Sequence, residues 1–523
     1  MKSSTLSLDP KVLAHDVICV FESDFLDIYL RLTSWLEERK ERSLIFLAEA
    51  GTAFQDNFLF LSQIPQVICY SLTKESEEQI YTSLAWKFVF LKFYFLSEKK
   101  EDSESEQRQK EIFSKLAHIQ SAVHLVASEY TDLGKVVAQN IFENGSFLEE
   151  SLPLSSLYQS CRNIPAIICG AGPSLENEIL LLKEYRHKAL VFGGGSALSV
   201  LSGFSLQPDC SVSFDPDPPY RRYLQQTAFE APFFYQGRVS YELSKLVHGK
   251  RVIAPASKGY LLEEWLLQAL KKADTTFDSG WVVGNFATAL ATFLGCNPII
   301  VVGMDLSFSD KEMYAAGVAG GEAISDGIPC KNSNGEDCLT KPDWLMAAKW
   351  FEEFAEAHPE ITFINASSSG IQIEGMEKGS LQDIAARYFS SSYDIQGHFH
   401  TALFDHEKEA SHSLLDQARN EFQESLRRVE SFCEKILQNM FQNYPNLSKD
   451  TGNTVLLELD LEQELFFRVV LDPFWNVWKH IFAREESLEE GLTLFIHKIL
   501  FFKKMVTEFS KIFYRGDEYA GSI

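Results

Sequence analysis

The sequence has no long uninterrupted apolar run. Its most apolar stretch, residues 84–96, contains Lys87 and Lys92 and falls short of the roughly 20 residues that a membrane-spanning helix needs. The N-terminal residues are polar and lack the basic-then-apolar pattern of a secretory signal. We therefore expect a cytoplasmic chain without a membrane span, in which residues 84–96 form an aromatic-rich helix of the N-terminal region.

Positive charge is scarce relative to negative charge. The 523 residues include 48 Lys and Arg against 73 Asp and Glu, which gives a formal net charge of -25. A protein that binds a nucleic-acid backbone needs a basic stripe that neutralises phosphates, and this sequence contains none. The charge balance therefore argues against nucleic acid, and equally against an anionic membrane surface, as the main partner.

The nine cysteines include no CxxC pair. Cys169, Cys210 and Cys296 lie in apolar or near-turn contexts, which is typical of buried thiols. Cys330 and Cys338 share a polar loop and are close enough in sequence for a disulfide or a metal site, but no His lies nearby. We interpret them as an incidental pair in a reducing compartment.

The most informative stretch is a short apolar run that stops at a glycine turn. Residues 164–169 are followed by Gly170, Ala171 and Gly172, and Pro173 and Ser174 then open a helix-like segment. Proline suits the first turn of a helix, and glycine lets a ligand approach the backbone. Because backbone N–H groups and the helix dipole favour anions at such a turn, the stretch predicts a phosphate site.

Four later segments repeat this pattern of an apolar strand with a polar end. They are residues 189–192, 210–214, 299–302 and 362–364, which precede Gly193, Asp215, Gly303 and Asn365. In open parallel sheets, ligands bind outside the carboxyl ends of the strands. The order of these segments predicts an α/β fold with a Rossmann-like, mostly parallel sheet and a nucleotide crevice at one edge.

Candidate site residues follow from these strand ends. Asp215 and Asp305 are carboxylates that can act as a base toward an acceptor hydroxyl or together hold Mg²⁺, which prefers oxygen ligands. Asn285 and Thr288 begin another helix and can cap it or contact a ligand. The residues expected to bind the cofactor are Gly170, Ala171, Gly172, Ser174, Gly194, Ser196, Asn285, Thr288, Gly303, Asn365 and Gly370.

Several separated strings resemble the MptE-like domain. They are CGAGPSL (169–175), GSALSVL (195–201) with PDCSVSFDP (208–216), VVGNFATALATFLGCNPIIVVGMDLSFSD (282–310) and NASSSGIQIEG (365–375). That domain is shared by archaeal 6-hydroxymethylpterin diphosphokinases and by the Maf motility accessory factors, which are linked to flagellin glycosylation. The Gly-x-Gly-Pro-Ser-Leu string is also similar to one in bacterial sialyltransferases, which use a CMP-sugar donor. The resemblance covers residues 163–378, and residues 130–144 resemble the Asn-containing segment that precedes the domain in larger members.

One position departs from the family pattern. Many members carry a His in Asp-Gly-x-Thr-His-Ala-x-Gly, where this chain has Tyr314. A phenol with a pKa near ~10 is a poor general base at neutral pH, although it can hydrogen-bond a phosphate. The substitution puts a His mechanism in doubt and leaves nucleotide binding intact, so Tyr314 is expected to orient a phosphate.

The chain divides by pattern into three expected domains. The pattern of residues 1–145 predicts a small α/β domain with strands near 44–48 and 66–70. Residues 146–388 are expected to form the MptE-like catalytic domain. Residues 389–523 are expected to form a helical domain. Pro473 should kink or break a helix in the last part. These helices can pack on the catalytic domain or form a homo-oligomer interface.

Three functions fit the resemblance and the residues. The first is a glycosyltransferase that uses a nucleotide-activated sugar, with CMP as one candidate nucleotide and a protein as one candidate acceptor. The second is an ATP-dependent diphosphokinase acting on a pterin alcohol, which would need Mg²⁺ and hence paired carboxylates. The third is a non-catalytic nucleotide-binding or scaffold protein, which Tyr314 makes credible.

Overall fold

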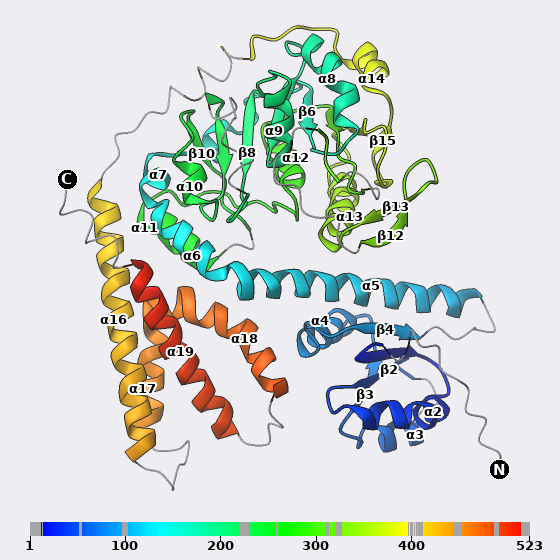
Figure 1. Cartoon of the computed structure of the whole chain (residues 1–523), viewed down its shortest axis with the longest axis vertical. Helices are drawn as coiled ribbons and strands as arrows, with labels where there is room; N and C mark the ends of the chain where they lie inside the picture. Colours follow the sequence, from blue (N-terminus) through cyan, green and yellow to red (C-terminus); the bar gives the residue numbers. More distant parts are fainter. Residues whose placement is uncertain are drawn as a thin grey trace. The chain divides into compact units, whose positions relative to one another are not determined.

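The computed structural model describes residues 12, 14–51, 55–96, 103–219, 230–257, 260–308, 313–316, 318, 327–395, 397, 401, 403, 412–442, 452–485 and 491–513. Figure 1 shows the elements coloured along the chain. They group into two compact units, Met1–Thr131 with Trp475–His497, and Asp132–Phe474 with Lys498–Ile523. The three-domain division at 145/146 and 388/389 stays a prediction.

The first unit contains a four-stranded parallel sheet in the order β3-β2-β1-β4. Its strands are β1 (Val17–Phe21), β2 (Ser43–Glu49), β3 (Val67–Leu72) and β4 (Phe93–Leu96), with α2 (Phe25–Glu38), α3 (Gln55–Leu61), α4 (Glu77–Lys87) and α5 (Ser103–Ser128). Central strand β1 is buried throughout, as expected of a parallel strand covered on both faces. The two strands expected in this region are therefore confirmed.

The helix expected over residues 84–96 is wrong. Helix α4 ends at Lys87, and Phe90 adopts a left-handed φ of 67° that a helix cannot continue. Residues 93–96 then pair in parallel with β1, so that Phe93 and Tyr94 contribute to separate apolar clusters. The aromatic spacing therefore reflects the two faces of a strand.

The second unit is built on a nine-stranded parallel sheet in the order β15-β14-β11-β6-β7-β8-β9-β10-β5. The strands are β5 (Leu152–Pro153), β6 (Ala166–Cys169), β7 (Leu190–Gly194), β8 (Cys210–Ser213), β9 (Phe233–Tyr235), β10 (Arg251–Ile253), β11 (Ile299–Val302), β14 (Phe363–Asn365) and β15 (Glu377–Lys378). All carboxyl ends therefore point to one edge, and the predicted convergence of the strand ends is confirmed.

Helices cover both faces of this sheet, because successive side chains of each strand point to opposite sides. Ile168 belongs to an apolar cluster with helices α12 (Val283–Phe293) and α13 (Pro342–Ala357). Its neighbour Ile167 belongs to a second cluster with α8 (Leu175–Glu184), α9 (Ser196–Gly203) and α14 (Leu381–Tyr388). The sheet is the middle layer of an α/β/α sandwich (Figure 1).

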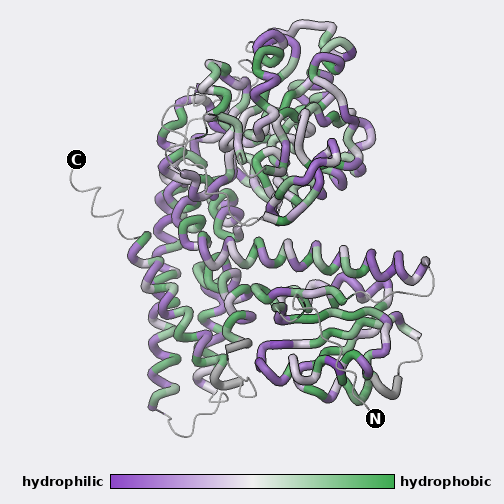
Figure 2. The backbone as a smooth tube through the Cα atoms, turned by 45° about the vertical axis from the view of Figure 1, so that its right-hand side comes forward, coloured by the Kyte–Doolittle hydropathy of each residue, from purple (hydrophilic) through white to green (hydrophobic). Residues whose placement is uncertain are grey.

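Further helices make up much of the remaining chain. They are α6 (Gly134–Glu143), α7 (Gly145–Glu150), α10 (Tyr241–Ser244), α11 (Leu261–Ala269), α16 (His412–Gln442), α17 (Gly452–Gln463), α18 (Asp472–Glu485) and α19 (Gly491–Phe513). Figure 2 shows hydrophilic and hydrophobic residues alternating along the long ones. None of the described helices is long and apolar enough to cross a membrane.

Part of the C-terminal region packs on the sheet-bearing unit. The Phe422 ring of α16 lies 5.6 Å from the Trp265 ring of α11, and Phe513 lies 4.4 Å from Phe142 of α6, measured between ring centroids. Pro473 lies at the second position of α18, directly after a π-helical turn at Phe467–Leu471. Helices α16 and α19 therefore contact the unit that contains the central sheet, as in the first of the two alternatives that the sequence left open.

Candidate functional site

The sheet has a topological switch point between β6 and β11. From β6 the chain proceeds through β7, β8, β9 and β10 in one direction, while β11, β14 and β15 extend the sheet in the other. A crevice at such a point is the usual ligand site of an open parallel sheet. The backbones of the turns after these two strands lie in contact. A Cβ added to Gly170 would meet the carbonyl of Gly303, so only glycine allows this approach. Gly303 itself has a left-handed φ of 66°.

The side chain of Asp305 occupies the N-terminus of helix α8. Its Oδ2 accepts a hydrogen bond from the Ser174 backbone N–H at 2.9 Å, and its Oδ1 accepts one from the Ser174 hydroxyl. A Cβ on Gly172 would meet the same carboxylate, so glycine permits this close approach. The predicted anion site at Gly170 to Ser174 therefore holds an anionic group of the chain itself.

Asp305 is buried, although the sequence suggested an accessible carboxylate. It is 2% exposed, and this burial raises its pKa, while hydrogen bonds from Ser174 and Ser369 oppose the rise. A buried carboxylate with its oxygens turned to Ser174 cannot reach an acceptor without leaving the helix. In this structure Asp305 fixes the turn after β6.

The loop after β14 supports the turn that carries Asp305. The Ser367 hydroxyl accepts from the Met304 N–H at 2.9 Å, and the Asn365 Oδ1 accepts from the Ser367 N–H at 3.0 Å. Gly370 has a φ of 103°, and a Cβ there would meet the Asp305 backbone. Asn365 and Gly370, both predicted to bind cofactor, are thus brought to the switch point as structural supports.

Tyr314 lies beside the first glycine turn. Its neighbour Ala315 donates its backbone N–H to the Ala171 carbonyl at 2.9 Å. The Tyr314 ring makes an edge contact with Trp344 of α13 at 6.4 Å. The part of the departing motif at residues 309–312 lies outside the described residues.

The more open part of this edge follows β7 and β8. Gly194, Gly195 and Ser196 are half-exposed, and Gly195 precedes α9 with a left-handed φ of 52° and no side-chain cap. Asp215 follows β8, is half-buried, and accepts from the Asp217 N–H at 3.1 Å. Two predicted elements, a glycine turn at a helix start and a carboxylate, therefore lie on neighbouring strands.

The side chains of Asn285 and Thr288 form hydrogen bonds with other parts of the fold. The Asn285 Oδ1 accepts from the backbone N–H groups of Trp281 and Val282 at 3.0 and 3.2 Å, and its Nδ2 donates to the Ala347 carbonyl at 3.2 Å. The Thr288 hydroxyl donates to the Gly284 carbonyl. Asn285 closes the loop that precedes α12, which is the capping role considered from the sequence.

Two buried asparagines, which the sequence did not single out, hold the loop after β9. Asn144 donates to the carbonyls of Gly237 and Val239 at 3.0 and 2.8 Å, and Asn140 donates to the carbonyls of Pro216 and Arg238. Both belong to the Asn-containing segment before the domain. Their positions show why that segment accompanies the sheet: it fastens the loops that follow β8 and β9.

Glu263 of α11 is an uncommon buried carboxyl at the same loop. Its Oε1 accepts from the Gly237 N–H at 2.7 Å. Burial raises its pKa from 4.5 to about 7, against smaller opposing effects of the Gly237 hydrogen bond and the Arg238 charge.

A shared Mg²⁺ site does not fit the positions of Asp215 and Asp305. They follow β8 and β11, which are three strand spacings apart in the sheet, or roughly 14 Å at about 4.8 Å per spacing. Mg²⁺ binds its ligands at about 2.1 Å. Within the described ranges, no three or more His, Cys, Asp or Glu side chains are grouped to hold a metal.

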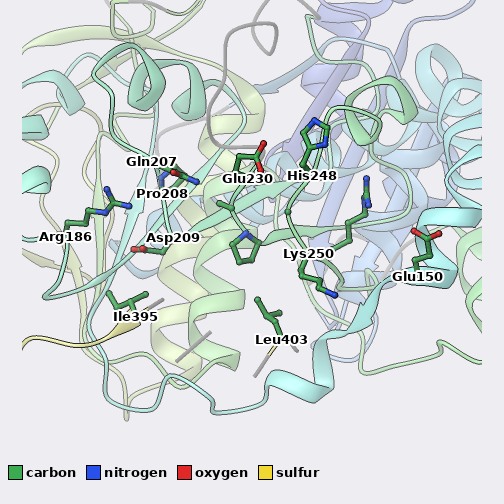
Figure 3. Close-up of a pocket in the computed structure, with 14 residues that line it drawn as sticks. Glu150, Arg186, Gln207, Pro208, Asp209, Glu230, His248, Lys250, Ile395 and Leu403 are labelled. Atoms are coloured by element: carbon green, nitrogen blue, oxygen red, sulfur yellow. The ribbon is translucent and has the colours of Figure 1, made fainter. Parts of the chain in front are cut away.

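A cavity of about 640 Å³ lies at the opposite, amino edge of the sheet (Figure 3). Residues just before β8 and β10 line it, among them Asp209 and Lys250, and Arg186 precedes β7. Burial raises the pKa of Asp209 to about 6, and its Oδ2 accepts from the Val191 N–H at 2.9 Å. The polar strand ends that predict a ligand site lie at the other edge of the sheet. We therefore do not take this cavity as the candidate site on its size alone.

Comparisons with known proteins agree with this reading of the sheet. Residues 138–311 match the family model described as 6-hydroxymethylpterin diphosphokinase MptE-like. The solved structure of the MAf glycosyltransferase from Magnetospirillum magneticum AMB-1 is similar with a TM-score of 0.53 and 14% identity, over 97% of this chain and 83% of that chain. No curated protein sequence matches. At this identity the structural likeness shows a common fold. The expected resemblance is thus confirmed for this part of the chain: residues 138–311 match the MptE-like family model, and the fold is similar to that of a MAf glycosyltransferase.

Proposed function

We propose that this chain is a glycosyltransferase that takes its sugar from a nucleotide-activated donor. The observation that carries the proposal is the switch point between β6 and β11, with glycine turns after β6, β7 and β11 at one edge. Likeness in fold to a MAf glycosyltransferase supports it across nearly the whole chain. The separation of Asp215 from Asp305 disfavours the diphosphokinase, which would need paired carboxylates.

The donor diphosphate or phosphate is assigned to the turn from Gly194 to Ser196. The start of α8 is filled by Asp305, whereas the residue before α9, Gly195, has no side chain of its own to occupy the start of that helix. Backbone N–H groups and the helix dipole at this turn would stabilise the negative charge that the phosphate gains as the sugar leaves. The string that resembles sialyltransferases lies in the neighbouring turn, at residues 170–175, and favours CMP as the nucleotide.

Asp215 is assigned as the base. Transfer forms a bond between an acceptor oxygen and the sugar, breaks the bond between the sugar and the phosphate, and releases the acceptor proton. A half-buried carboxylate one strand away from the phosphate turn can take that proton. Asp305 acts indirectly, by holding the turn after β11 against the start of α8, and Tyr314 is assigned to orient the phosphate.

A thermal-shift panel tests the proposal. CMP, UDP, GDP and ATP, with and without Mg²⁺, are compared on the full chain, and CMP should raise the melting temperature most. Incubation with a CMP-linked sugar and candidate protein acceptors then tests transfer. ATP-dependent diphosphorylation of a hydroxymethylpterin would overturn the proposal, and a melting temperature unmoved by every nucleotide would favour a scaffold.

A further inference from the structure

Two half-exposed cysteines face each other across a β-hairpin. Strands β12 (Ile328–Lys331) and β13 (Asp337–Thr340) are antiparallel, and Cys330 pairs directly with Cys338. Their sulfur atoms are 3.1 Å apart. A disulfide needs Cα atoms roughly 4.4–6.8 Å apart, and directly opposed residues of antiparallel strands are roughly 4.5–5.5 Å apart. The hairpin backbone therefore already holds the pair at bonding geometry.

We propose that Cys330 and Cys338 are a redox modification site, at which a low-molecular-weight disulfide such as oxidised glutathione converts the two thiols into a cross-strand disulfide. Of the nine cysteines, six are buried, and Cys69 is the other half-exposed one. Cys69 lies on β3, in the other compact unit. From the sequence alone, the two cysteines are interpreted as an incidental pair, whereas in the structure they lie directly opposite each other on paired strands.

The two thiols are coupled across the hairpin. Burial and the contact with Cys338 raise the pKa of Cys330 to about 12, so the two thiols do not ionise together. At a sulfur–sulfur distance of 3.1 Å, the thiol that keeps its proton can donate it to the thiolate of the other. One thiolate at a time is therefore available to attack a disulfide reagent.

The reaction balances in two exchanges. One cysteine of the pair, as its thiolate, attacks one sulfur of oxidised glutathione, the reagent's sulfur–sulfur bond breaks, and one glutathione thiolate leaves. The other cysteine then loses its proton to solvent and attacks the sulfur of the first, which releases the second glutathione. The two cysteines lose two electrons and two protons in total, and the reagent is reduced to two thiols.

The disulfide would stiffen a hairpin that is attached to the switch-point turn. The Thr340 hydroxyl donates to the Leu306 carbonyl at 2.7 Å, and the Ser333 N–H donates to the Gly370 carbonyl at 2.7 Å. A two-stranded hairpin is marginally stable by itself, so a covalent link between its strands should limit its opening. Oxidation therefore acts next to the turn that carries Asp305.

Peptide mass spectrometry after oxidation tests the proposal on the full chain. The protein is incubated with oxidised glutathione, free thiols are alkylated, and tryptic peptides are compared with a dithiothreitol-treated sample. We expect Cys330 and Cys338 to escape alkylation and to appear as one linked pair, while Cys69 is alkylated in both samples. Tryptic cleavage after Lys331, the last residue of β12, should slow several-fold in the oxidised protein. Full alkylation of both cysteines after oxidation would overturn the proposal.

Single substitutions test the two-step exchange. In Cys330→Ser and in Cys338→Ser, the remaining hairpin cysteine should retain one glutathione as a mixed disulfide, because no second thiol resolves it. Cys69→Ser should leave the linked pair unchanged. Absence of a mixed disulfide from both hairpin variants would overturn the two-step exchange, and loss of the pair in Cys69→Ser would overturn the site.

Discussion

The Asp305 carboxylate accepts a hydrogen bond from the backbone N–H of Ser174 at 2.9 Å, between the turns after β11 and β6, the strand pair at which the strand order reverses. This contact places a buried negative charge at the start of α8, where the helix dipole favours it. It also joins the two turns that frame the crevice. The contact explains why Gly172 lies in the first turn, because a Cβ there would meet the Asp305 carboxylate.

Replacing Asp305 should mainly lower the stability of the fold, because its carboxylate bonds the start of α8 instead of a substrate. Asp305→Ala leaves the Ser174 N–H buried without its partner, and we expect a loss of about 2–4 kcal/mol in the free energy of unfolding. Asp305→Asn should lose much less, because an amide oxygen still accepts that N–H. Urea unfolding measures both variants. A double-mutant cycle with Ser174→Ala should give a coupling of about 0.5–3 kcal/mol, and a coupling of zero would contradict the role.

Gly172 should tolerate no side chain for the same reason. In Gly172→Ala the new Cβ meets the Asp305 carboxylate, so we expect a loss of about 1–3 kcal/mol in stability through overpacking. Gly203→Ala is the matched control, because nothing lies within 4 Å of a Cβ there. Thermal denaturation should show a lower melting temperature for the first variant alone. Equal melting temperatures would mean that the turn relaxes around the methyl group.

Asp215 should govern turnover. Asp215→Asn is nearly isosteric and can still accept the Asp217 N–H, so we expect donor affinity to stay close to that of the wild type. Turnover should fall by about 10²-fold or more, as for loss of a general base. The exposed Asp217→Asn is the control and should keep wild-type turnover. Full activity of Asp215→Asn in a transfer assay would remove Asp215 from the mechanism.

Glu263 should make stability depend on pH. Its pKa rises from 4.5 to about 7 on folding, because the carboxyl is buried. Between these values the folded chain keeps a proton that the unfolded chain releases, so stability falls as the pH rises from 4.5 to about 7 and then levels. The effect is at most about 3 kcal/mol.

Glu263→Gln checks this pH dependence. The amide can still accept the Gly237 N–H but does not titrate, so urea unfolding should show a flatter profile from pH 4.5 to 7 and greater stability at pH 8 than wild type. The neighbouring Glu264 is exposed, and Glu264→Gln should keep the wild-type profile. An unchanged slope in Glu263→Gln would contradict the raised pKa.

Much of the central sheet could be predicted from sequence, because its strands are short apolar runs with polar ends. The run at 299–302 is strand β11 in full, and β6, β7, β8 and β14 fall within a residue or two of their predicted bounds. Strands β9, β10 and β5 were not predicted. They are two or three residues long, and their burial comes from neighbours that are distant in sequence.

The site was harder to predict than the sheet. Strand ends indicate which residues lie at one edge, and Gly170, Gly194, Asp215 and Asp305 do lie there. Whether a side chain faces a ligand or another part of the chain depends on tertiary contacts. Asp305 turns to Ser174, and Asn285 turns to its own loop. No local pattern distinguishes these from the half-buried Asp215.

Hydrogen–deuterium exchange with and without CMP tests the central claim most directly, because it reports which edge of the sheet binds the donor nucleotide. The account predicts that CMP protects the turns at residues 193–196 and 213–217, with smaller changes at 170–174. Residues 207–209 and 248–250, which line the cavity at the amino edge, should exchange as they do without ligand. Protection confined to those cavity residues, with none at the carboxyl edge, would contradict the account.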